Sequence, residues 1–192
     1  CSSDLVHFSQ EEKSMEHMKN VRSLTVAALL VALAVTLKFL KIVITPTLEF
    51  SFAFLANASA GFLFGPFVSG TVGALADVLG YLVRPTGPFF PGFTLNAIIN
   101  GVVYGLILYK KPLSMKRVVI ARVINTVLIS FLLNPLWLSM MYGKAFHLLV
   151  KTRFIKAAIL FVPECILLFA ILQLVQKIAM NASLLQRRST SE

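Results

Sequence analysis

The chain has 192 residues, of which 57% are hydrophobic and only 14% charged, and its mean hydropathy is +0.82. A soluble domain of this size has too little interior for so many apolar side chains, so we expect an integral membrane protein without a separate soluble enzyme domain. The net charge of +10 would suit a nucleic-acid-binding protein, but the basic residues lie beside the apolar segments, which favours membrane topology as their explanation.

Six apolar segments follow one another along the chain, and each is close to the length that crosses a bilayer. We therefore expect an all-α integral membrane fold, a six-transmembrane-helix bundle over residues 21–180 between polar tails at 1–20 and 181–192. The expected helices are residues 21–40, 52–64, 65–83, 93–109, 118–141 and 154–179.

Glycine and proline mark the breaks between these helices. Residues 41–51 hold a proline among β-favouring residues, which predicts an extended loop or a small hairpin. Gly-Pro-Phe at 65–67 predicts a tight turn, and residues 84–92, with three prolines, cannot be helical. Pro135 is expected to kink the fifth helix, and helix 52–64 is short enough to be tilted or partly buried.

The most compact cationic loop, residues 110–117, belongs in the cytoplasm by the positive-inside rule. Counting six spans from it makes a multi-pass protein of the cell membrane with both termini in the cytoplasm. The long loops at 41–51, 84–92 and 142–153 then face outside. On that outer side lie Lys38, Lys41, Arg84, Lys144, Lys151, Arg153 and Lys156. This excess of positive charge indicates attraction of an anion from outside, although the same side chains would also suit snorkelling to lipid headgroups.

Asp77, Tyr81 and Arg84 recur at intervals that place them on one face of the third helix. An ionised carboxylate inside a membrane is costly unless it is paired or hydrated, so Asp77 should face the bundle interior. It lies about 10 Å below the outer loop at 1.5 Å per residue, which suits the floor of an outward-facing ligand pocket. The alternative is a structural role, in a buried pair with Arg122 or a hydrogen bond to Asn125.

Asn96 and Asn100 repeat on one face of the fourth helix, with Tyr104 one turn further on. Two amides on one face supply both donors and acceptors. Such a pair suits recognition of a flat heterocycle, and it suits hydrogen bonding between helices equally well.

Aromatic residues gather at the outer ends of the helices. Phe89, Phe90 and Phe93 lie in or beside the proline-rich loop, as a lid over an aromatic ligand or as a surface that dips into the membrane. Trp137 and Tyr142 lie at the outer end of the fifth helix, where an aromatic belt at the membrane interface is the simplest explanation.

Ala28 and Ala32 in the first helix have the spacing at which small residues let another helix approach closely. The sequence contains no phosphate-binding P-loop, no nucleophile motif, and no histidine–cysteine spacing typical of metal sites. We therefore expect no enzyme activity, metal or cofactor. A small bundle with an outer anion site and no energy source indicates a capture subunit that is driven by a partner.

Two blocks of the sequence resemble a known family. One is GFLFGPFVSGTVGALADVLGYLVRPTGPFFPGFTLNAIINGVVYGLILYKK at 61–111; the other is LNPLWLSMMYGKAF at 133–146, followed by RFIKAAI at 153–159. Both resemble the folate-specific substrate-binding subunits, or S components, of energy-coupling-factor (ECF) vitamin transporters, over essentially residues 21–179. This resemblance implies a six-helix fold whose vitamin pocket faces outside and is closed by the loops after helices one and three.

The resemblance also implies partners and a ligand. The partners would be a membrane scaffold protein, which meets Ala28 and Ala32, and two cytoplasmic ATPases. The ligand would be folate, with its pterin ring on the polar and aromatic residues, its benzoyl ring under the phenylalanines, and its two carboxylates on outer cations, among them Lys41 or Arg153. The expected ligand-binding residues are Asp77, Arg84, Phe89, Phe90, Phe93, Asn96, Asn100, Trp137, Tyr142 and Lys144.

Three other functions fit parts of the pattern. The chain could be a stand-alone permease or a membrane enzyme for an anionic metabolite, with Asp77 and Glu164 as proton-relay carboxylates. It could be a structural subunit without a ligand, whose polar residues only join helices. Within the resembling family it could bind another vitamin, such as thiamine or riboflavin, although the outer positive charge disfavours cationic thiamine.

Overall fold

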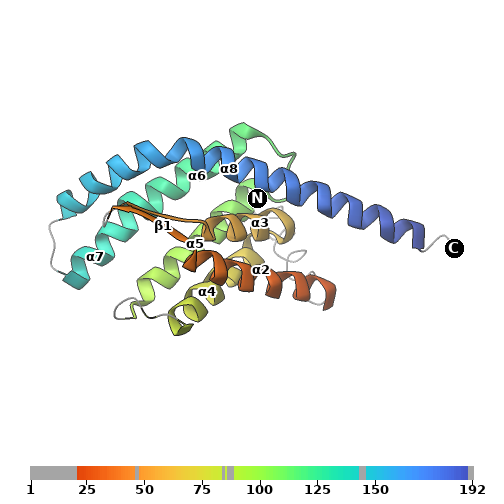
Figure 1. Ribbon diagram of the computed structural model, residues 1–192, viewed down its shortest axis with the longest axis horizontal. Coiled ribbons are helices and arrows are strands. Elements are labelled where there is room, and N and C mark those ends of the chain that lie inside the picture. Colours follow the sequence, from red (N-terminus) through yellow and green to blue (C-terminus); the bar gives the residue numbers. More distant parts are fainter. Residues whose placement is uncertain (1–20, 46–47, 84, 86–88, 143–145, 190–192) are drawn as a thin grey trace, which may run out of the picture.

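The computed structural model describes residues 21–45, 48–83, 85, 89–142 and 146–189. Helices dominate, in the positions that the apolar segments predicted (Figure 1). They are α2 (Val21–Phe39), α3 (Ala53–Phe64), α4 (Pro66–Val83), α5 (Pro91–Leu108), α6 (Met115–Asn125), η1 (Thr126–Leu133), α7 (Asn134–Tyr142) and α8 (Phe146–Ser189). The all-α prediction therefore holds for the membrane domain. The one departure is a pair of strands, β1 (Lys41–Thr45) and β2 (Leu48–Ser51), which pair antiparallel as the predicted small hairpin.

Four helical stretches among the described residues are long and apolar enough to cross a membrane. They are Pro66–Val83, Pro91–Leu108, Met115–Met141 and Ala157–Asn181. The apolar parts of the two remaining helices, Ser23–Phe39 and Ala53–Phe64, are shorter than these. The protein is thus a membrane protein with several apolar helices.

The last helix is longer at both ends than its apolar segment. We predicted residues 154–179, followed by a polar tail, whereas α8 runs from Phe146 to Ser189. Residues 182–189 include two leucines, two arginines, one glutamine and one alanine, which are all good helix formers. The polar residues after Asn181 therefore mark the end of the apolar, membrane-crossing part of α8, while the helix itself continues to Ser189.

The short helix α3 is the centre of the bundle. It contacts α2, α4, α5 and α8, and most of its residues are buried. Its alanines and glycine let these neighbours approach closely, with Ala58 and Ala60 fully buried. A short turn at Gly65, which has φ 89° and donates its N–H to Gly61 O, leads directly into α4 at Pro66, as the sequence predicted.

Helices α4 and α5 pack backbone to backbone. A Cβ atom added at Gly101 would lie 2.3 Å from the carbonyl oxygen of Ser69, and one at Gly73 would lie 2.4 Å from that of Ala97. Any side chain at either position would therefore separate the two helices. This close contact fixes the faces of α4 and α5 that are turned toward the interior.

Helices α6, η1 and α7 form one continuous stretch, and its middle part is wound as a π-helix. The N–H of Asn134 bonds to Ile129 O, five residues earlier. Pro135 follows immediately, and its ring would clash with the carbonyl group of Phe131 in a regular α-helix. The wider turns upstream accommodate the proline, where the sequence had predicted a simple kink.

Candidate functional site

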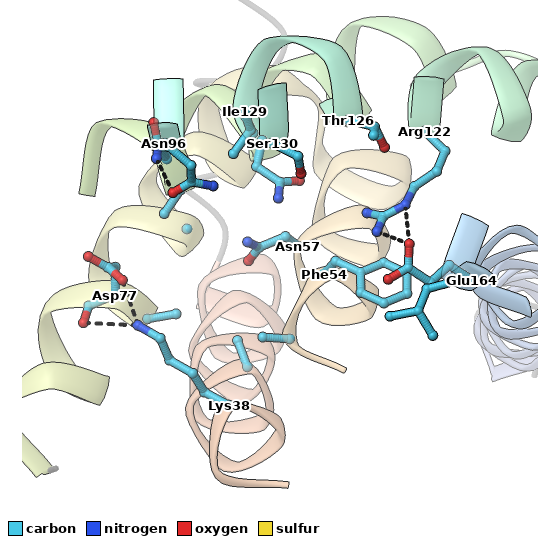
Figure 2. A pocket seen from close by; sticks show the side chains of 18 of the residues that line it. Lys38, Phe54, Asn57, Asp77, Asn96, Arg122, Thr126, Ile129, Ser130 and Glu164 are labelled. Carbon is cyan, nitrogen blue, oxygen red and sulfur yellow. Dashed lines mark hydrogen bonds and ion pairs between the residues drawn. The ribbon is translucent and has the colours of Figure 1, made fainter. Parts of the chain in front are cut away.

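A cavity of about 400 Å³ lies between α2, α3, α4, α5, the α6–η1–α7 stretch and α8 (Figure 2). This volume is within the range of small-molecule sites. Apolar side chains form part of its wall, and several polar side chains face it. These polar residues are Lys38, Asn57, Asp77, Asn96, Asn100, Arg122, Thr126, Ser130, Asn134 and Glu164.

An ion pair between α2 and α4 forms one end of the cavity. The Nζ atom of Lys38 lies 2.5 Å from Oδ1 of Asp77, and the hydroxyl group of Thr94 donates to Oδ2 at 3.0 Å. Asp77 faces the bundle interior, as predicted, but its suggested structural partners were wrong: it bonds to neither Arg122 nor Asn125. Lys38 reaches it from the last turn of α2, an approach that depends on how the two helices lie side by side.

A second ion pair lies across the cavity, between α6 and α8. Arg122 donates through Nε (3.0 Å) and Nη2 to Oε2 of Glu164, and through Nη1 to the hydroxyl of Tyr104 at 3.2 Å. Its guanidinium group lies 4.5 Å from the centre of the Phe54 ring. These contacts connect α3, α5, α6 and α8 through one charged group. Both charges are compensated, as charges at this depth require.

A polar track runs along the α6–η1–α7 stretch, formed by Arg122, Thr126, Ser130 and Asn134, every fourth residue. In a regular α-helix each such step turns about 40° beyond a full rotation, so a stripe of this kind drifts away from one face. The wider turns of η1 offset this drift. They keep all four side chains on the cavity.

A hydrogen-bonded group joins the cavity to an aromatic cluster. Trp137 Nε1 donates to Oδ1 of Asn96 at 3.1 Å, and Nδ2 of Asn96 donates to Oδ1 of Asn134 at 3.2 Å. The Phe90 ring lies 5.6 Å from the Trp137 ring and 6.0 Å from that of Phe93. Both ends of the Asn96 amide are therefore hydrogen-bonded to other side chains of the protein. Trp137 forms one of these bonds, so its position is not explained by a membrane-interface belt alone.

The structure places the predicted ligand-binding residues in several groups. Asp77, Asn96 and Asn100 line the cavity. Phe90, Phe93 and Trp137 form the adjoining aromatic cluster, while Phe89 is separate from it, with its ring 5.1 Å from that of Tyr81. Arg84 and Lys144 lie outside the described residues, and so does the side chain of Tyr142, the last residue of α7.

The partner-binding prediction concerns the opposite side of α2 from the cavity. Ala28 and Ala32 are both exposed, whereas Ala34 and Lys38 on the same helix line the cavity. The helix α2 therefore presents a small-residue surface outward and a charged group inward.

Sequence reasoning did not assign Lys38, Asn57, Arg122, Glu164 or the hydroxyl groups of η1 to the cavity. Three of these are charged residues within apolar helices, a signal that could have marked them as facing the interior. Thr126 and Ser130 gave no comparable signal, because a single hydroxyl group in an apolar helix can bond to the backbone of its own helix and needs no polar surroundings.

Comparison with known proteins gives consistent results. Residues 22–180 match the family described as ECF transporter, substrate-specific component. The chain is 37% identical to the folate transporter FolT of Clostridium novyi, over 84% of this chain and 94% of that one, and 33% identical to FolT of Leuconostoc mesenteroides, over 74% and 80%. A crystal structure described as FolT bound with folic acid is similar at a TM-score of 0.72 and 38% identity, covering 78% of this chain and 92% of that one.

The family match spans nearly the whole described membrane domain, and the two relatives are 37% and 33% identical to this chain over most of it. The cavity and its buried ion pairs lie within the matched residues. This chain belongs to the family of ECF transporter substrate-specific components.

Proposed function

We propose that this chain is the folate-binding membrane subunit of an ECF-type vitamin importer, a transport component and not an enzyme. The observation that carries the proposal is the similarity, at 38% identity over most of both chains, to a FolT structure containing folic acid. At this identity the helices that surround the cavity are shared, so a site for the same class of ligand is expected in the same place.

The chemistry of the cavity supports this proposal. Folate combines a flat heterocycle rich in donors and acceptors with a benzoyl ring and two carboxylates. A cavity of about 400 Å³ lined by amides and hydroxyls suits a heterocycle of that kind. In the proposed complex the aromatic residues Phe90, Phe93 and Trp137 cover the rings, and Phe89 and Tyr142 contribute at the edge. Arg84 and Lys144 attract the carboxylates.

We also propose the topology and the partners. In this arrangement α2 and α3 complete a six-helix bundle, and the cationic loop at 110–117 and both termini face the cytoplasm of the cell. The cavity then opens outward in the free subunit. The exposed small-residue surface at Ala28 and Ala32 would meet the membrane scaffold, which in turn carries two ATPases.

Uptake into proteoliposomes tests this proposal against a stand-alone permease. The subunit alone should bind folate without accumulating it inside, with or without a proton or sodium gradient. Folate should accumulate only when the scaffold and ATPases are present together with ATP. Gradient-driven accumulation by the subunit alone would instead establish the permease, since an S component has no energy source of its own.

A further inference from the structure

Most polar groups of the cavity already have partners within the protein. Both carboxylate oxygens of Asp77 accept hydrogen bonds, from Lys38 and Thr94. The guanidinium group of Arg122 is bonded to Glu164 and Tyr104, and the amide of Asn96 is bonded on both sides. A ligand that used these groups would have to compete with existing bonds. The residues available for recognition are therefore those without such bonds.

Asn57 on α3 is such a residue. It is 8% exposed, lines the cavity, and its side-chain oxygen is buried with no hydrogen-bond partner among the described residues. Two buried hydroxyl groups nearby do have partners: that of Ser59 donates to Leu55 O and that of Ser69 to the backbone oxygen of Asn57 itself, both at 2.8 Å. Burying an unpaired amide is costly, so its presence at the centre of the bundle requires an explanation.

The close-up view supplies one. Figure 2 shows the Asn57 side chain pointing from α3 into the space between the Lys38–Asp77 pair and the Arg122–Glu164 pair. Asn100 on α5 lines the same cavity, and its side-chain oxygen is also buried without a partner in the described part of the chain. Two unpaired amides from two helices thus border one space.

We propose that Asn57, together with Asn100, binds the hydrogen-bonding edge of the ligand's flat heterocycle and determines its specificity. The proposal rests on the proposed function, in which that heterocycle is the pterin ring of folate. A carboxamide presents a donor and an acceptor side by side, which complements the adjacent C4 carbonyl and N3–H of a pterin. A carboxylate offers acceptors only. We therefore assign recognition of the pterin ring to Asn57, where the sequence had suggested Asp77 and Asn96. The side chains of Asp77 and Asn96 instead stabilise the wall of the cavity through their bonds within the protein.

Calorimetric binding to the detergent-purified chain tests this inference with folate and with N-(4-aminobenzoyl)-L-glutamate, a fragment that keeps the benzoyl ring and both carboxylates of folate but lacks the pterin ring. Asn57→Asp should weaken folate by about 10- to 100-fold, because the carbonyl group of the ligand then faces an acceptor. The fragment has no pterin edge for residue 57 to contact, so its affinity should change very little. The ratio of the two dissociation constants should therefore shift by about tenfold, a change that a purely structural role of Asn57 would not produce.

A second variant, Asn57→Leu, tests the same assignment if the aspartate variant does not fold, because leucine is compatible with the interior of a membrane bundle. It should weaken folate by about tenfold or more. The matched control is Asn125→Leu: Asn125 is also buried with an unpaired side-chain oxygen, but it does not line the cavity. This control should leave folate binding unchanged.

The two possible failures are distinguishable. Absence of folate binding by the unmodified chain would overturn the proposed function itself. Folate binding by the unmodified chain, with an equal affinity for Asn57→Leu or an equal loss for Asn125→Leu, would overturn only the assignment of Asn57. An unchanged ratio of the two ligands in a folded Asn57→Asp variant would do the same.

Discussion

Replacing Arg122 with methionine should destabilise the protein by about 3–5 kcal/mol, because it leaves the carboxylate of Glu164 buried without its partner. Only 14% of the Arg122 side chain and 13% of the Glu164 side chain are exposed, so water cannot replace the lost interaction. Arg122 also donates to Tyr104 and lies over the Phe54 ring, so its removal affects four helices at once. In thermal unfolding of the detergent-purified chain, we expect the midpoint to fall by on the order of 10 °C.

The double variant Arg122→Met with Glu164→Leu identifies the cause. If the loss comes from the unpaired carboxylate, removing both charges should restore most of the stability, since an apolar pair of similar volume replaces a buried ion pair at little cost. Arg117→Met is the matched control on the same helix: Arg117 bonds to Pro112 O at the surface, and its loss should shift the midpoint very little. A double variant no more stable than Arg122→Met would contradict this explanation.

Replacing Asp77 with asparagine should cost about 2–3 kcal/mol, because the ammonium group of Lys38 then lies beside the cavity without a counter-charge. This loss of stability is smaller than the loss expected for a fully buried charge, because 34% of the Lys38 side chain is exposed and can be hydrated. Thr94→Val, which removes only the hydroxyl that donates to Asp77, should cost about 1 kcal/mol and serves as the smaller reference. Thermal unfolding in detergent measures both variants.

Folate binding by the double variant Asp77→Asn with Lys38→Met separates two roles of Asp77. If the pair is part of the cavity wall, removing both charges should restore stability and also most of the folate affinity. Recovered stability with persistently weak binding would show that Asp77 contacts the ligand, as the sequence alone suggested.

The sequence predicted the helix positions well, because proline, glycine and polar residues interrupt the apolar segments at the places where the helices end. The turn at Gly65–Pro66 and the break after Val83 were placed in this way, and α5 begins at the last proline of the loop. Asp77 was also correctly predicted to face the interior, since charged groups in apolar helices avoid lipid. Asn96 and Asn100, which were predicted to share one face of their helix, both line the cavity.

The pairing of these residues could not be predicted, because it depends on which helices are neighbours. Asp77 had two plausible partners in the sequence, and neither is the lysine that α2 brings to it. The polar track along η1 was hidden for another reason: four residues spaced by four drift around a regular helix, and only the π-helical winding before Pro135 keeps them on one side. Asn57 was overlooked because its small, apolar neighbours in α3 gave no pattern to which a polar function could be attached.

Direct binding of folate tests the central claim most simply. Trp137 is the only tryptophan in the sequence and is bonded to Asn96 in the cavity wall, so its fluorescence should report ligand entry. Folate should be titrated into the ligand-free, folded protein, with calorimetry as a second readout and thiamine and riboflavin as controls. We predict saturable binding of folate alone, accompanied by quenching of Trp137. Tight binding of another vitamin in place of folate, or no binding of folate by either method, would contradict the proposed function.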